Sequence, residues 1–406
     1  MNGWRHIFWE KTVVACVIVP GSTGQPTKQI RTFGTMTADL EALAAWLRDQ
    51  AVTHVAMEAT GVYWQPLYNV LEDEFTLLLA NARHIKMVPG RKTDVKDCEW
   101  IADLLRHGLL RGSFVPERAQ REVRELTRYR TALLHERSSE VNRLHKTQVE
   151  ANLQLAAVAT DILGLSGRQI LDALVAGSTA PALLAELAHG RLRDKRPALE
   201  RALAGRVRPH HRFLLAQQLA HIDDLDAVIA QVSTEIETRL RPFAATLERL
   251  DTIPGISQRA AEILLAELGP DLTAFPSAAH LASWAGLCPG NHQSAGERLS
   301  GRPRPGNPAL RALLVQAAHA AGRTQTHLGA RYRRLAHRKG RKRAAVAVAH
   351  TLLRIVYALL TQHTVYQDLG VHYFDQQHRQ AIERRAIRRL ESPGYTVTLA
   401  PTQPAA

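Results

Sequence analysis

The 406-residue chain has little cysteine, no long apolar run and too few acidic residues to balance its basic ones. Its cysteines, Cys16, Cys98 and Cys288, stand singly, so neither a disulfide framework nor a zinc site with paired cysteine ligands is encoded. No unbroken apolar run reaches the roughly 20 residues of a membrane-spanning helix. The start, Met1–His6, lacks the pattern of a signal peptide. These absences predict a reduced, cytoplasmic protein with no membrane partner.

The charge balance is strongly basic. Lys and Arg number 52 against 38 Asp and Glu, which gives a net charge of +14. At 45% hydrophobic residues the composition is that of a globular protein, and its length allows two or three domains at about 150 residues each. An arginine-rich excess on such a composition indicates a polyanionic partner, which we expect to be nucleic acid.

Three carboxylates lie where predicted strands and helices end or begin. The apolar strand 53–58 ends at Glu58, and a helix from about 94 to 107 opens with Asp94 and Asp97, three residues apart and therefore on one face. Carboxylates suit Mg²⁺ or Mn²⁺, and two such ions can stabilise the attacking and leaving oxygens of a phosphoryl transfer. The pattern predicts a metal-dependent nucleic-acid enzyme. The alternative, that Asp94 and Asp97 only complement a helix dipole, stays open.

The hydrophobic pattern predicts an α/β domain followed by helical ones. Strands are expected at 12–19, 27–33, 53–58 and 75–80, with helices at 39–50, 64–72 and 94–107. Antiparallel strands followed by alternating strands and helices indicate one mixed sheet, as in ribonuclease-H-like domains. From 117 to 245 apolar stripes predict long helices that act as a spacer and oligomerisation element without chemistry of their own, interrupted around Gly164–Gly167. We predict domains at 1–112, 113–246 and 247–365 and a basic tail at 366–406.

Two loops in the C-terminal half have candidate functions. Pro254-Gly255-Ile256, between two helical patterns, resembles a helix-hairpin-helix turn, whose N–H groups approach a phosphate without reading sequence. An ordinary helix connection is the alternative. Ser294 lies in a glycine-rich polar loop near His292 and Arg298. A serine becomes a nucleophile only beside a base, a metal or dense positive charge, and most serines in turns are structural.

The most basic stretch of the chain is 331–343. Each phosphate that it neutralised would release counterions and strengthen binding at low salt. The next segment, 344–361, is apolar and predicts a buried helix, so a nucleic-acid contact is favoured over a merely solvated basic face. The candidate nucleic-acid-binding residues are Arg331, Arg333, Arg334, Arg338, Lys339, Arg341, Lys342 and Arg343.

Several motifs together resemble the IS110 family of insertion-sequence transposases, in the right order and over nearly the whole chain. They are Met57–Trp64, Lys92–Asp97, Pro254–Ile256, Gly286–Gly296, Gly306–Arg311, the basic block, Leu352–Tyr357 and Gly394–Leu399. The resemblance implies a RuvC-like domain with an Asp-Glu-Asp-Asp metal set, a coiled coil and a C-terminal transposase domain. Glu58, Asp94 and Asp97 match three of the acids, and Ser294 matches the catalytic serine. It also implies a tetramer that works with a structured non-coding RNA of its own element, which pairs with donor and target DNA.

The first acid of that metal set has no counterpart in this chain. Family members begin with Gly-Ile-Asp-Val-His-Lys-Lys-Thr-Val-Val-Ala, whereas here the matching Thr-Val-Val-Ala starts at Thr12 and the acid's position falls on Ile7. Isoleucine cannot bind a metal, and Glu10, three residues on, would point to the other face of the strand. The resemblance therefore predicts either an impaired copy or a reading frame that starts elsewhere.

The sequence thus predicts a DNA transposase or recombinase that cuts and rejoins strands with a metal site and a serine nucleophile, guided by RNA. Two alternatives stay open. A structure-selective nuclease acting on branched DNA would have no use for the Ser294 loop. A degenerate, non-catalytic copy would keep the basic block, bind RNA and DNA, and lose cleavage.

Overall fold

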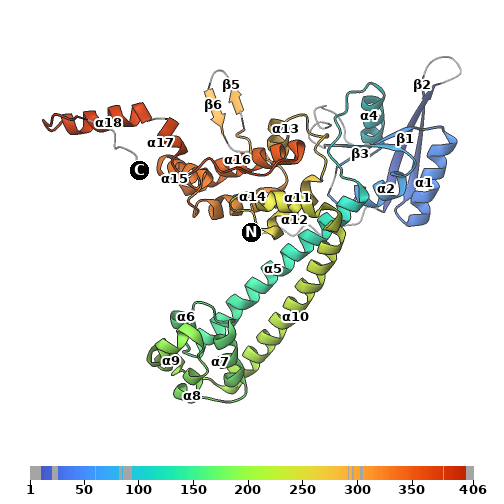
Figure 1. Cartoon of the computed structure of the whole chain (residues 1–406). Helices are drawn as coiled ribbons and strands as arrows, with labels where there is room; N and C mark the ends of the chain where they lie inside the picture. Colours follow the sequence, from blue (N-terminus) through green and yellow to red (C-terminus); the bar gives the residue numbers. More distant parts are fainter. Residues whose placement is uncertain are drawn as a thin grey trace. The chain divides into compact units, whose positions relative to one another are not determined.

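The structure, a computed structural model, describes residues 11–20, 26–59, 61–81, 85, 94–290, 292–294, 297–301, 305–377 and 379–398. The chain divides into two compact units, Met1–Pro116 and Glu117–Ala406 (Figure 1). The predicted domain 1–112 remains a prediction. The predicted division of the second unit at 246 and 365 remains a prediction.

Two strands open the first unit, and strands and helices alternate after them, as the hydrophobic pattern predicted. Each predicted boundary lies within two residues of the observed one. Helix α1 shows why the pattern was informative, because Leu40, Leu43 and Leu47 recur at helical spacing and are all buried. The elements are β1 (Thr12–Pro20), β2 (Pro26–Gly34), α1 (Thr37–Asp49), β3 (His54–Glu58), α2 (Trp64–Leu71), β4 (Thr76–Ala80) and α4 (Asp94–Arg106).

The pairing of these strands differs from the prediction. β1 pairs antiparallel with β2, and β3 pairs parallel with β4, so both orientations are present. The expectation of one mixed sheet is wrong for the described residues, which form two separate two-stranded sheets here. Residues of both β1 and β3 line a cavity of about 1580 Å³. The two sheets nevertheless share a core that includes Val17, Met57 and Leu79.

Two long helices form an arm in the second unit. α5 (Arg118–Glu150) and α10 (Pro209–Leu240) run antiparallel, with Leu133 packed against Leu225 and Ile229 (Figure 1). At 1.5 Å per residue, the 33 residues of α5 span about 50 Å. The long helices predicted between 117 and 245 are confirmed, while their role in oligomerisation remains a prediction.

A small helical subdomain closes the far end of the arm (Figure 1). We call residues 151–208 the tip subdomain. Backbone hydrogen bonds from Gln154 N–H to Ala202 O (2.8 Å) and from Arg206 N–H to Ala151 O (2.7 Å) hold it together at the end of α5. From the sequence, only an interruption of the long helices was expected in this segment. Its elements are α6 (Leu155–Val158), α7 (Leu165–Val175), α8 (Pro181–Glu186), η1 (Gly190–Lys195) and α9 (Arg196–Leu203).

In the rest of the second unit, helix α16 (Arg341–Gln362) lies at the centre of a bundle and contacts α11, α13, α14 and α15. Its length and composition alone would suit a membrane span, but half of its apolar stretch is buried inside the unit, including Val348, Leu352 and Val356. α16 is therefore a core helix, as predicted for 344–361. The other elements are η2 (Arg241–Phe243), α11 (Ala244–Asp251), α12 (Gln258–Leu268), α13 (Ala278–Trp284), β5 (His292–Ser294), β6 (Glu297–Ser300), α14 (Pro308–Ala321), α15 (His327–Lys339), α17 (Tyr373–Gln377) and α18 (Arg379–Glu391).

The Pro-Gly-Ile turn joins α11 to α12, as predicted. Gly255 has φ +91°, and a Cβ there would lie 2.4 Å from the carbonyl oxygen of Ala317 on α14, so glycine is required at this position. The Ile256 N–H donates to Ile253 O at 3.0 Å and closes the turn. The turn is packed against α14, and its contact with a phosphate remains a prediction.

A buried ion pair fixes α5 to α12. Arg130 Nη2 lies 2.7 Å from Glu262 Oε2, and the two side chains are only 2% and 3% exposed. Neither charge has water to solvate it, so each depends on the other to offset its desolvation.

We expect Glu262→Ala to lower the free energy of unfolding by about 3–5 kcal/mol, because it leaves Arg130 buried without a counter-ion. The double variant Arg130→Met/Glu262→Leu removes both charges and should regain most of that loss. Urea denaturation followed by circular dichroism measures both. A single variant as stable as the parent, or a double variant weaker than the single, would contradict this account.

Candidate active site

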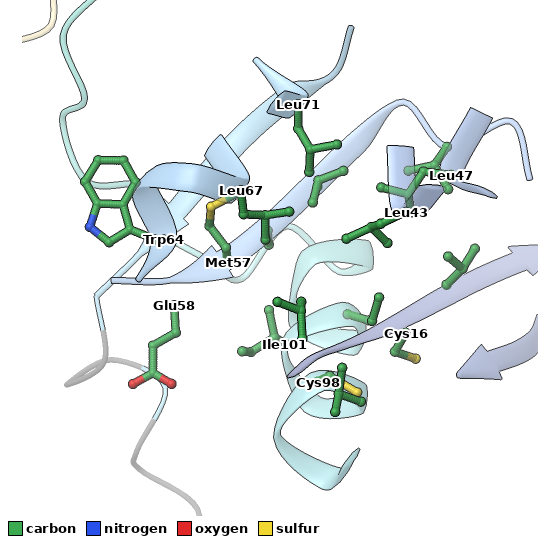
Figure 2. Close-up of a pocket in the computed structure, with 18 of the residues that line it drawn as sticks. Cys16, Leu43, Leu47, Met57, Glu58, Trp64, Leu67, Leu71, Cys98 and Ile101 are labelled. Atoms are coloured by element: carbon green, nitrogen blue, oxygen red, sulfur yellow. The ribbon is translucent and has the colours of Figure 1, made fainter. Parts of the chain in front are cut away.

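β3 brings Glu58 to the cavity of the first unit. Met57, one residue earlier, is buried in the core, whereas Glu58 is half-buried at the end of the strand. Figure 2 shows its carboxylate directed away from Leu43, Leu47 and Leu71, the apolar side chains that line the other part of the cavity. The acid is thus kept out of surroundings in which an unpaired charge would be costly.

α4 places a second predicted acid on the wall of the same cavity. This helix packs against β1, and its cavity-lining residues include Asp97, Ile101 and Leu105. The structure therefore brings Glu58 and Asp97 to one cavity from separate elements. Asp94 is the first residue of α4, but its side chain, like all of Ile7, lies outside the described residues.

The donor chemistry at this cavity fits a divalent metal only in part. Within the described ranges, no three His, Cys, Asp or Glu side chains are grouped closely enough to hold an ion. Glu58 and Asp97 supply two hard carboxylates of the kind that Mg²⁺ and Mn²⁺ prefer. A complete site needs a further ligand, and Asp94 is on the same helix, three residues before Asp97.

The two cysteines that line the cavity are not rival ligands. The Cys98 thiol on α4 donates to the carbonyl oxygen of Val95 at 3.1 Å, and burial raises the pKa of Cys98 to about 11 (Cys16 of β1 and Cys98 are labelled in Figure 2). Metal binding needs the thiolate, which is scarce at such a pKa. Asp103 of α4 receives a 2.7 Å hydrogen bond from Lys28 Nζ, which lowers the pKa of Asp103 and ties α4 to β2.

Ser294 is the last residue of β5, where it pairs with Glu297 of β6. The side chains of His292, Ser294 and Arg298, and the turn 295–296, lie outside the described residues. The described backbone does define the base of the segment 286–306 that contains Ser294. A Cβ on Gly306 would lie 2.3 Å from the backbone nitrogen of Gly286, so the two ends of the segment are in direct backbone contact.

A buried carboxylate holds one end of this segment. Glu267 of α12 is completely buried and accepts hydrogen bonds from Arg128 (2.7 and 3.0 Å) and from Asn307 Nδ2 (2.6 Å). Arg124 Nε lies 3.2 Å from the same carboxylate; burial lowers the pKa of Arg124 to about 10, an effect that the charge of Glu267 opposes. Asn307 Oδ1 also accepts from the Leu310 N–H at 3.1 Å and so caps α14.

Sequence reasoning missed this network, because charged residues on amphipathic helices normally face solvent. One signal was present in the sequence. Asn307 followed by Pro308 is the pattern of a helix N-cap and first turn, and it predicts that the Asn307 side chain is held at the start of a helix.

The predicted basic block spans the end of α15 and the start of α16, with Gly340 (φ +80°) between them. Five of its residues are exposed and form no ion pair with any described residue: Arg338, Lys339, Arg341, Lys342 and Arg343.

The other three predicted residues have contacts within the protein. Arg333 donates to the carbonyl oxygens of Thr324 (2.9 Å) and Gly322 (3.3 Å), just beyond the end of α14. Arg334 lies over the ring of Phe374, 5.5 Å from its centroid, and Arg331 is half-buried. The surface available to a phosphate backbone is thus centred on the junction of α15 and α16.

Comparison with known proteins gives a consistent result. Residues 9–151 match the DEDD transposase model of IS110 elements, and residues 247–333 match a model described as transposase, IS116/IS110/IS902 family. The chain is 28% identical over 321 residues to a probable family 20 transposase of Pseudomonas aeruginosa, covering 77% of this chain and 85% of the relative. An insertion element IS110 protein of Streptomyces coelicolor is 27% identical over 311 residues, covering 71% and 76%. The transposase for insertion sequence element IS1111A of Coxiella burnetii is 26% identical over 297 residues, covering 71% and 72%.

The similarity to transposases thus extends over most of the chain, including the α/β unit and part of the helical unit. The protein is a DNA transposase by class. More particularly, it belongs to the IS110 family of insertion-sequence transposases, as the motifs of the sequence indicated.

The Asn307 contacts can be tested separately. Asn307→Ala loses both the cap and the bond to a buried carboxylate, and we expect the free energy of unfolding to fall by about 2–4 kcal/mol. Asn307→Ser keeps a capping hydroxyl and loses only the donor to Glu267, so it should be more stable than the alanine variant by about 1 kcal/mol. Urea denaturation measures both values, and equal stability of all three proteins would refute the assigned contacts.

Proposed function

We propose that this transposase cuts and rejoins DNA strands with a carboxylate metal site and a serine nucleophile, and that an RNA of its own element guides it. The observation that supports this proposal most is the placement of Glu58 and Asp97, from β3 and α4, on one cavity. We assign the first unit to the RuvC-like, ribonuclease-H-like fold that the family resemblance implies.

Glu58, Asp94 and Asp97 are the residues that would hold Mg²⁺ or Mn²⁺ in this cavity. When bound, the metal supplies Lewis-acid stabilisation of the phosphoryl oxygens. The protein's own part is to fix the two described carboxylates on a strand end and a packed helix, so that they need not reorganise during the reaction. With Ile7 in place of the first acid, we expect weaker metal binding than in a chain with four acids.

Ser294 is the proposed nucleophile. Its Oγ would form a bond to the phosphorus of the DNA backbone, while the bond from phosphorus to one sugar oxygen breaks and that oxygen takes up a proton. The serine proton passes to a base, for which His292 is the neighbouring candidate. The product is a covalent phosphoserine link, and attack by a DNA hydroxyl on that phosphorus reverses the step, rejoins a strand and releases the serine.

The exposed cations at the junction of α15 and α16 would hold the DNA backbone without reading its sequence. A protein that contacts mainly the backbone obtains specificity by another route, such as base pairing by a guide RNA. We propose that such an RNA, and assembly as a tetramer, complete the active complex.

Two variants test the chemistry. Ser294→Ala should abolish strand exchange and any covalent protein–DNA adduct, since the one hydroxyl that is lost is the proposed nucleophile.

Glu58→Gln should lower cleavage by about 100-fold, because several kcal/mol of charge stabilisation are lost at the metal site. Glu74→Gln, which removes an exposed acid paired with Arg48 in the same unit, is the matched control and should leave cleavage unchanged. Cleavage of labelled junction DNA is the measurement, and undiminished cleavage by the Ser294→Ala protein would refute the serine mechanism in favour of a nuclease.

RNA guidance predicts a particular pattern of binding. The protein alone should bind duplex DNA with a steep salt dependence and little preference between sequences. Adding RNA transcribed from the non-coding flank of the element should create a preference for the element's junction DNA. Electrophoretic mobility shifts with and without the RNA measure this, and full site preference of the RNA-free protein would overturn the guided mechanism.

A further inference from the structure

The tip subdomain and the adjoining start of α10 carry a second concentration of positive charge, far along the arm from α15 and α16. Residues 189–212 include eight Lys or Arg and only two acids, Asp194 and Glu200. Six of these basic side chains are exposed, and we call them the tip cations: Arg191, Arg193, Lys195, Arg201, Arg206 and Arg208.

The tip cations differ from basic residues nearby, such as Arg137 on the arm and Arg168 on α7, which are paired with acids. Arg137 pairs with Asp226 (2.5 Å) across the arm, and Arg168 pairs with Asp223 (2.5 Å) where the tip meets α10. Among the described residues, none of the tip cations forms an ion pair. Six like charges that repel one another are a cost to the folded tip unless an anion binds there.

The tip cations are held by a packed scaffold. Leu199 and Leu203 anchor α9 in the core of the tip, and the loop after α9 lies directly on the end of α5. A Cβ on Gly205 would lie 2.6 Å from the carbonyl oxygen of Ala151, which in turn accepts from the Arg206 N–H. Arg206 and its neighbours are therefore presented from a fixed backbone, so less conformational entropy is lost when they bind a ligand.

We propose that the tip cations bind the phosphate backbone of duplex DNA, so that the arm is a DNA-binding element and more than a spacer. Five of the six are arginines, whose planar guanidinium matches two phosphate oxygens at once. Duplex DNA presents one charge per about 1.7 Å of its axis, which can engage several of them together. The proposal depends on DNA being the substrate of this transposase and does not depend on the metal or serine chemistry.

The test uses the full chain and a matched pair of triple variants. Arg193→Gln/Arg201→Gln/Arg206→Gln removes three tip cations. Arg137→Gln/Arg143→Gln/Lys146→Gln removes the same charge from α5, where each cation has an acidic partner. Binding of a fluorescent 40-base-pair duplex is measured by anisotropy in EDTA at several salt concentrations, so cleavage chemistry cannot affect the result. Thermal melting by circular dichroism confirms that both variants are folded.

We expect the tip variant to reduce the slope of log K against log salt by roughly 2–3, at about 0.9 per lost phosphate contact, and the control by less than one. Equal slopes for the tip variant and the parent would overturn the proposal. Loss of RNA binding with unchanged DNA binding would also overturn it and assign the tip to RNA. A changed oligomeric state in analytical ultracentrifugation with unchanged DNA binding would assign the tip cations to self-association. The exposed apolar side chains of Leu183 and Phe213 could take part in such a contact.

Discussion

The packing of the second unit depends on one buried carboxylate. Glu267, with no solvent exposure, is surrounded by Arg124 and Arg128 of α5 and by Asn307 at the start of α14. A charge in this position is tolerated only with several aligned donors, so each of the three elements must adopt its place for the others to be stable. One interaction therefore positions the base of the arm, helix α12 and the end of the segment that contains Ser294.

Arg130 and Glu262 form a second buried ion pair between the same two helices, α5 and α12. Buried ion pairs add little stability compared with apolar side chains of similar size, but they penalise wrong registers strongly, because a displaced helix leaves charges unpaired. Two ion pairs lie along the contact between α5 and α12. Together they set both the register and the direction of α5. The base of the arm is held against α12 by these ion pairs together with apolar packing of Val123 on Leu265, and further along the arm Leu133 packs on Ile229.

Local features of the fold were predictable and long-range ones were not. The strand at 12–19 and the helix at 94–107 follow from apolar periodicity, which is a property of neighbouring residues. Whether β1 pairs with β3 depends on contacts distant in sequence, and there the prediction of one mixed sheet failed. For the site, the sequence led to Glu58 and Asp97, which do line one cavity. It did not lead to Glu267 or the tip cations, because a charged helix face looks the same in sequence whether it is buried, paired or free.

The arm gives the second unit two separate basic surfaces, one at the tip and one where α15 meets α16. The 33 residues of α5 span about 50 Å, so the tip is remote from the base of the arm. Only backbone contacts are needed at such a distance, and they add affinity without adding sequence preference. If the tip binds DNA as proposed, it would supply binding energy away from the reacting phosphate. Under the proposed serine mechanism, the Ser294 segment would engage and release a strand while the DNA stayed bound at the tip, as breaking and rejoining the same strands would require.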